Sequence, residues 1–362
     1  MKPILNLAVR SWGCGALALI AALSLSNAHW ARADEYLPGG KEPMAGTAVP
    51  AAAEQATWQL PAQYSRDFGG VSILQVRPDL YMLTVDNVND VVETGWQGTL
   101  VVGTSPATHC EALVAAVRAI SEGPVRYLVS VNGDESRIGC NTPLAAAGQS
   151  FIKGTLGFVA PVISHQNALL QLLATGQNRP ATTLPSELYA RPVRSMYMND
   201  QAIQVIWAPA AHSGGDSLVV FRRSDVVVAG DIMDTTRFPV IDIARGGSIQ
   251  GELAAMNRLL SELAVAVTPK WQRPGGTLIV PGRGQLCTQV DVLNYRDMLT
   301  IIRDRVQDLI VRGKNLEQVQ AANPARGYTT RYGAISGDWT TSQFIAAVYQ
   351  SLIQERRGAK KK

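Results

Sequence analysis

Three polar stretches of the sequence carry the side chains that could bind a metal ion or transfer a proton. Asp134 lies in Ser130–Asn141 (Ser-Val-Asn-Gly-Asp-Glu-Ser-Arg-Ile-Gly-Cys-Asn), His212 lies in Ala208–Asp216 (Ala-Pro-Ala-Ala-His-Ser-Gly-Gly-Asp), and Asp231 follows Ala-Gly. Imidazole and carboxylate groups are common zinc ligands, and an unperturbed histidine titrates near neutral pH. The sequence therefore offers three candidate metal ligands, with His212 also a candidate general base.

Each of these side chains follows an apolar run that is typical of a buried strand. Val125–Val129 precedes the first stretch, Ala202–Trp207 the second, and Asp225–Ala229 leads to Asp231. A fourth run, Gly276–Val280, leads to Val-Pro-Gly-Arg-Gly, which contains Arg283. Loops that follow strands carry much of the chemistry of α/β proteins. We expect these loops to form one site.

The order of these loops resembles the metallo-β-lactamase fold family, from about Gly70 to Leu352. In that family the first loop reads H-x-H-x-D-H, followed by an apolar residue, two glycines and Asn. The framework is matched here by Ile138, Gly139 and Asn141, with Cys140 at the second glycine. The resemblance implies that His212, in Pro-Ala-Ala-His, and Asp231, at the position of the bridging aspartate, are retained metal-ligand positions.

The other ligand positions of the family are substituted. Asn132 and Asp134 stand at the first two histidines, Ser136 at the aspartate and Arg137 at the last histidine, while Arg283 replaces the histidine of P-G-H-G. Arginine stays protonated and offers no lone pair to a metal. We expect no bound metal, or at most one zinc ion held by His212, Asp231 and Asp134.

These substitutions also suggest a hypothesis about charge. A loop that gathers Asp134 and Asp231 needs positive partners, and guanidinium groups bind carboxylates through two parallel hydrogen bonds. We expect Arg137 and Arg283 to replace the metals electrostatically, and His212 and Asp231 to have structural roles. A serine hydrolase built on His212 and Ser136 is disfavoured, because the sequence lacks a G-x-S-x-G nucleophile elbow at Ser136.

The resemblance implies a four-layer αββα sandwich, and the residue pattern alone indicates the α/β (α+β) class. Two strand-rich halves are expected, separated by a loop at Gln177–Ser186. The further strands expected are Gly70–Val76, Leu80–Val85, Asp90–Glu93, Gly98–Val102, Ser217–Phe221 and, with a turn, Phe151–Val162. The helices expected are Pro106–Ile120, Pro143–Gln149, Asn167–Ala174, Gln250–Ala264, Asp291–Arg312, Asn315–Ala322 and Gln343–Gln354.

The N-terminus is typical of an export signal. Lys2 and Arg10 precede the apolar run Gly15–Leu25, and Ala31-Arg32-Ala33 fits an A-x-A cleavage site. We expect residues 1–33 to be a signal peptide, 34–66 an extended lead-in, 67–354 the metallo-β-lactamase-like domain and 355–362 a basic tail. The protein is expected in the periplasm or outside the cell, with no transmembrane segment in the mature chain.

Charge and cysteine content limit the partners. Cleavage after residue 33 would reduce the 33 basic residues to 30, against 29 acidic ones, so no nucleic-acid partner is expected. Cys110, Cys140 and Cys287 would remain, and two of them could pair in an oxidising compartment. Both a Cys140–Cys287 contact and unpaired buried thiols are compatible with the sequence.

Two function classes follow. The first is a binding or accessory protein without the dizinc hydrolase activity of the family, acting on an unknown small-molecule ligand or protein partner. The alternative is a metal-dependent hydrolase with a one-metal site of His212, Asp231 and Asp134. The fold does not select a substrate.

Overall fold

The computed structural model describes residues 65–152, 157–264 and 276–359, all within the unit Leu60–Lys362. The expected signal peptide and nearly all of the expected lead-in lie outside the described residues. The last two lead-in positions, 65 and 66, instead begin the first strand.

The first half of this unit is a sheet of eight described strands. An antiparallel meander is followed by three parallel neighbours, because helices connect the later strands. The strands are β1 (Ser65–Phe68), β2 (Val71–Arg77), β3 (Leu80–Val85), β4 (Val88–Gly95), β5 (Gly98–Val102), β6 (Val125–Val129), β7 (Val162–His165) and β8 (Glu187–Tyr189).

The second half is a sheet in the order β9-β10-β11-β12-β13, with β12 and β13 parallel. Its strands are β9 (Val193–Met198), β10 (Gln201–Trp207), β11 (Ser217–Phe221), β12 (Val226–Asp234) and β13 (Leu278–Arg283). Among the described residues, the two halves share one strand pairing, between Val88 at the start of β4 and Arg283 at the end of β13. Arg283 therefore lies where the two sheets meet.

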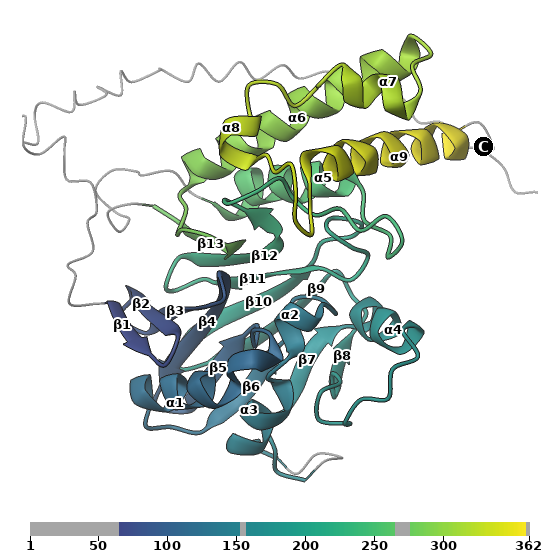
Figure 1. Cartoon of the computed structure of the whole chain (residues 1–362). Coiled ribbons are helices and arrows are strands. Elements are labelled where there is room, and N and C mark those ends of the chain that lie inside the picture. The colour runs from purple at the N-terminus through teal and green to yellow at the C-terminus, as the bar shows by residue number, and fades with distance from the viewer. Residues whose placement is uncertain (1–64, 153–156, 265–275, 360–362) are drawn as a thin grey trace, which may run out of the picture. The chain divides into compact units, whose positions relative to one another are not determined.

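Helices cover the outer faces of both sheets (Figure 1). On the first half they are α1 (Cys110–Ile120), α2 (Glu135–Ile138), α3 (Asn141–Ala147) and α4 (Gln166–Ala174). On the second half they are α5 (Ile249–Arg258), which continues as a π-helical segment (Leu259–Leu263), α6 (Gln289–Val311), α7 (Leu316–Ala321), α8 (Thr329–Tyr332) and α9 (Thr341–Ala359).

Three hydrophobic cores show that the described layers are α, β, β and α. Successive side chains of a strand point to opposite faces, so each central strand serves two cores. In β12, Val228 packs between the sheets and Val227 packs against the helices of the second half. In β5, Val102 packs between the sheets and Val101 packs against α1 and α3. The predicted αββα sandwich is confirmed.

Most expected elements are present, with shifted ends. The strand expected at Asp225–Ala229 continues to Asp234, and α9 includes Arg356 and Arg357, which were expected in the tail. The strand expected at Phe151–Val162 is wrong among the described residues, because β7 begins only at Val162. None of the described helices combines the length and apolar character needed to cross a membrane.

A disulfide joins Cys110 to Cys140, with Cα atoms 5.2 Å apart. The considered contact between Cys140 and Cys287 is therefore wrong, and Cys287 is a free, buried thiol. Because α1 begins at Cys110 and Cys140 lies between α2 and α3, the disulfide ties the loop with Asp134 and Arg137 to the first helix.

Candidate functional site

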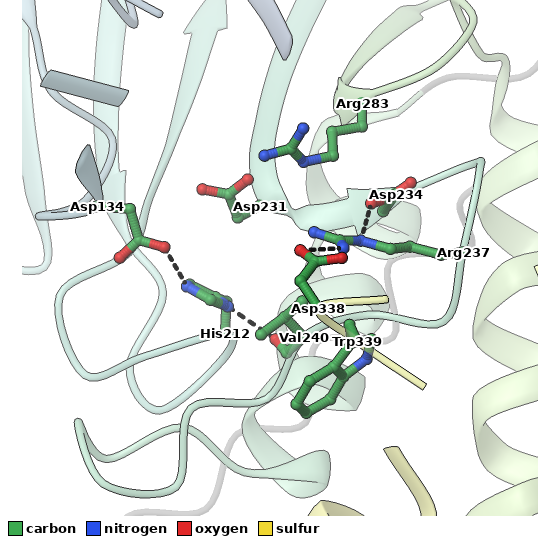
Figure 2. Close-up of a pocket in the computed structure, with 9 residues that line it drawn as sticks. All are labelled: Asp134, His212, Asp231, Asp234, Arg237, Val240, Arg283, Asp338 and Trp339. Carbon is green, nitrogen blue, oxygen red and sulfur yellow. Dashed lines mark hydrogen bonds and ion pairs between the residues drawn. The ribbon is translucent and has the colours of Figure 1, made fainter. Parts of the chain in front are cut away.

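The expected loops converge at one edge of the sandwich. Asp134 precedes α2 and Arg137 lies within it, His212 lies between β10 and β11, and Asp231 belongs to β12. Arg283 ends the neighbouring strand β13. Figure 2 shows Asp134, His212, Asp231 and Arg283 around one cavity. The sequence-based expectation of a shared site is met for these five residues.

The guanidinium of Arg137 forms the centre of the site. Its Nε donates to Asp231 Oδ2 at 2.9 Å, and its Nη2 pairs with Asp231 Oδ1. The remaining contacts are to backbone carbonyls, from Nη1 to Asn89 at 3.0 Å and from Nη2 to Gly282 at 2.8 Å. Arg137 is only 1% exposed, so every guanidinium nitrogen is bonded inside the protein.

This pair fixes the charge of both partners. Burial opposes ionisation of Asp231, but the Arg137 charge and its hydrogen bonds outweigh that cost and hold the pKa of the carboxyl far below its usual range. Burial likewise opposes the Arg137 charge, and Asp231 again raises the pKa of the guanidinium on balance. The predicted pairing of Arg137 with an aspartate of the site is confirmed.

Gly282 makes this geometry possible. A Cβ atom at this position would lie 2.3 Å from Arg137 Nη2 and 2.6 Å from the carbonyl oxygen of Gly230. The second residue of Pro-Gly-Arg-Gly must therefore lack a side chain, because the backbone itself contacts the guanidinium.

His212 is buried and held from both sides of its ring. Its Nδ1 lies 2.7 Å from the carbonyl oxygen of Val240, which can only accept, and its Nε2 lies 3.0 Å from Asp134 Oδ2. Burial would lower the pKa of His212, but the hydrogen bond and charge of Asp134 raise it well above its usual value. Asp134 therefore favours the imidazolium form of His212, in which both ring nitrogens donate.

Asp134 has a second cationic partner, Arg245, which sequence reasoning missed. Arg245 Nη1 lies 2.5 Å from Asp134 Oδ1, and its Nε pairs with Asp242 Oδ2 at 2.7 Å. Despite burial, the combined effect of His212 and Arg245 lowers the pKa of Asp134. No motif marks Arg245, which lies in a loop between β12 and α5.

Of the two remaining substituted positions in the first loop, Asn132 bonds residues of the site and Ser136 does not. Asn132 Nδ2 donates to Asp231 Oδ2 at 2.8 Å and to Asp216 Oδ1 at 3.1 Å, so it links two loops. The side chain of Ser136 forms no hydrogen bond to another described residue and does not line the cavity. Glu135, a conceivable substitute ligand, pairs with Arg179 instead.

Three further carboxyl groups lie buried in and around the site, and sequence reasoning assigned none of them a role in it. Burial raises the pKa of Asp90 to about 7, against the hydrogen bonds donated by Ser105, and that of Asp216 to about 6. Burial also raises the pKa of Glu252 well above its usual value, and neither of its oxygens has a hydrogen-bond partner among the described residues. In the sequence, Asp90 could have been singled out because it is a carboxylate within the largely apolar strand β4.

The cavity itself has a volume of about 220 Å³. Its other lining residues are Asp234, Arg237, Val240, Asp338 and Trp339. Arg237 pairs with Asp234 at 3.1 Å and with Asp338 at 2.9 Å, as Figure 2 shows. The cavity is therefore bordered by ion pairs on most sides.

The comparison with solved structures gives the fold. A metallo-beta-lactamase from Pontibacter korlensis aligns with a TM-score of 0.50 at 13% identity, over 64% of this chain and 99% of that one. The sec-alkylsulfatase Pisa1 from Pseudomonas sp. aligns with a TM-score of 0.57 at 14% identity, over 77% of this chain and 49% of that one. A double mutant of PisA1 aligns with a TM-score of 0.58 at 14% identity, over 78% of this chain and 50% of that one. The chain has the metallo-β-lactamase fold.

The chain thus spans about half the length of the two alkylsulfatase structures and nearly all of the bacterial metallo-beta-lactamase. No family model matches the sequence, and no curated protein does. At 13% and 14% identity, these likenesses establish the fold alone.

The metal ions that the metallo-β-lactamase fold implies require donor atoms with free lone pairs. One ligand atom each from Asp134, His212 and Asp231 lies within 4.8 Å of the other two, as in a metal site. However, Arg137 bonds both oxygens of Asp231, and neither Arg137 nor Arg283, at the positions of two family histidines, offers a lone pair to a metal. The described donors do not fit a pair of zinc ions.

Proposed function

We propose that this chain is a binding or accessory protein of the metallo-β-lactamase fold that works without the dizinc hydrolase chemistry. The observation that carries the proposal is the buried Arg137–Asp231 pair. The positive charge of Arg137 lies against the carboxylate of Asp231, which stands at the position of the aspartate that bridges the metal ions in the family.

This replacement removes the source of a nucleophile. Zinc activates hydrolysis by lowering the pKa of a bound water molecule. A guanidinium provides a comparable positive charge, but it is a hydrogen-bond donor and does not coordinate water as a Lewis acid. His212 is also less suited to act as a general base, because the hydrogen bond and charge of Asp134 raise its pKa and favour the protonated form.

The proposal includes export to the periplasm or the cell exterior. The N-terminal signal pattern supports it, and so does the Cys110–Cys140 disulfide, since disulfides persist mainly in oxidising compartments. The named activities of the similar structures, metallo-beta-lactamase and sec-alkylsulfatase, belong to those proteins.

A one-metal hydrolase is the second candidate. It is favoured by the close approach of ligand atoms from Asp134, His212 and Asp231. The hydrogen bond from His212 Nδ1 to the Val240 carbonyl also supports it, because metal-binding histidines commonly hold their second nitrogen in this way.

Elemental analysis of the purified chain, residues 34–362, separates the two candidates. The sample is supplemented with zinc and dialysed, alongside His212→Ala and a control, His109→Ala, whose histidine is partly exposed and lies outside the site. Folded protein without stoichiometric metal is the expected result. Near-stoichiometric zinc that is lost in His212→Ala and kept in His109→Ala would refute the proposal and establish the alternative.

A further inference from the structure

Arg283 differs from every other charged side chain of the cavity because no described residue forms a hydrogen bond or ion pair with its guanidinium. The expected pairing of Arg283 with Asp134 or Asp231 is wrong: its guanidinium forms no hydrogen bond or ion pair with a described residue. Only its backbone is engaged, where the carbonyl accepts from Thr235 N at 3.1 Å. Figure 2 shows the side chain extending over the cavity toward Asp231.

The carboxylates around the cavity explain why Arg283 stays unpaired. Asp231 is bonded by Arg137, and Asp134 by His212 and Arg245. On the opposite wall, Arg237 pairs with both Asp234 and Asp338. Each acidic group that lines the cavity is therefore already in contact with another cation, and among the described residues Arg283 has no carboxylate in direct contact.

The charge of Arg283 itself lies in an unfavourable environment. Burial lowers the pKa of Arg283, and repulsion by Arg137 lowers it further, against a smaller opposing effect of Asp231. A half-buried cation without a counter-ion costs free energy, which an anion entering the cavity would offset. The geometry alone places this unpaired guanidinium against the space where such an anion fits.

We propose that Arg283 anchors a small organic oxyanion with a single negative charge in this cavity, a role that rests on the proposed metal-free binding function. The planar guanidinium matches the two oxygens of a carboxylate or of a sulfate monoester. Val240 and the indole of Trp339 also line the cavity and provide contacts for a short apolar group.

Charge and size restrict the ligand further. A dianion such as a phosphate monoester meets one unpaired cation and the nearby carboxylates of Asp231, Asp234 and Asp338, so its second charge is uncompensated. The volume of about 220 Å³ is below the usual range for drug-sized ligands and equals that of about seven water molecules. The ligand therefore has only a few carbon atoms.

Calorimetric titration of the chain, residues 34–362, in low-chloride buffer tests this assignment. The probes are butanoate and butyl sulfate, with butyl phosphate, butanol and butylammonium as charge controls. Binding of butanoate or butyl sulfate in preference to the controls is expected, and their relative affinity identifies the head group. The site is refuted if neither anion binds at tens of millimolar, or if butyl phosphate or butylammonium binds more tightly.

Variants assign the binding to Arg283. Arg283→Gln removes the charge and is expected to weaken the preferred anion about tenfold or more, because a hydrogen bond to a charged group is lost. Arg312→Gln removes an exposed arginine at the end of α6 and should leave affinity unchanged. Equal affinity of Arg283→Gln and the parent chain would overturn the assignment.

The remaining outcomes are also decisive. Without anion, Arg283→Gln should melt at or above the temperature of the parent chain, since no hydrogen bond or ion pair of the side chain with a described residue is lost. If Arg283→Gln does not fold, Arg283→Lys replaces it. Lysine retains the positive charge but lacks the planar guanidinium with its paired N–H donors, so this variant should bind the anion several-fold more weakly than the parent chain. Metal content is measured on the same samples. A metal-free chain that does not bind the anions refutes only this inference. A chain that contains zinc, and that loses both the zinc and its anion binding when a chelator is added, refutes the proposed function.

Discussion

Replacement of Arg137 by methionine tests the central ion pair most directly. Methionine keeps an unbranched apolar chain but removes the guanidinium, so Asp231 loses both of its arginine contacts and the carbonyls of Asn89 and Gly282 lose theirs. Asp231 keeps a hydrogen bond from Asn132. Loss of one partner of a buried ion pair costs about 3–5 kcal/mol.

The effect is measured by urea denaturation at neutral pH, followed by circular dichroism, for Arg137→Met, Asp231→Asn and the double variant. Each single change is expected to lower the free energy of unfolding by about 3 kcal/mol or more, because each leaves a buried charge alone. The double variant should cost about 2 kcal/mol less than the sum. Single effects below about 1 kcal/mol, or additive ones, would refute the view that the pair organises the site.

Three more predictions follow from the same geometry. Conversion of both Arg137 and Arg283 to histidine should lower the melting temperature without creating tight zinc binding in a metal titration; a stable, tight zinc-binding protein would contradict the proposed function. Asp90 has an unfolded pKa near 3.8 and a folded one of about 7, so its carboxyl lowers stability as pH rises between these values. The parent chain should therefore lose about 4 kcal/mol of unfolding free energy between about pH 4 and pH 7 that Asp90→Asn does not lose. Denaturation curves of the two proteins at both pH values measure this, and a difference in stability that is the same at pH 4 and pH 7 would exclude it. Gly282→Ala should destabilise by about 2 kcal/mol or more, because its methyl group overlaps the guanidinium, whereas Gly358→Ala in the open end of α9 should not destabilise; equal melting temperatures of the two would contradict the close contact.

The layers of the fold were predictable because local pattern and tertiary structure agree. Alternating or continuous apolar runs mark the strands, and the expected Asn315 cap does accept from Gln318 N in α7. Element ends were less predictable. Asp231, expected just beyond a strand, lies inside β12 because pairing with β13 continues past Gly230 as far as Asp234.

The site was predictable as a set of loops and only partly as a set of contacts. The match to a family pattern identified Arg137 and Asp231, and their pairing followed from charge. Arg245 was missed because its contact with Asp134 depends on how two loops fold back on each other. Arg283 was expected to pair with the same aspartates, but Asp231 is bonded by Arg137, and Asp134 by His212 and Arg245.

The Arg137–Asp231 pair also changes how the centre of the molecule depends on its surroundings. A bound metal stabilises a protein by an amount that rises and falls with the concentration of free ion. Here the cation is part of the chain, contributed by the first half, while its carboxylate partner belongs to the second. This contact between the two halves is therefore made by the chain itself, and its strength does not depend on the concentration of an ion in solution.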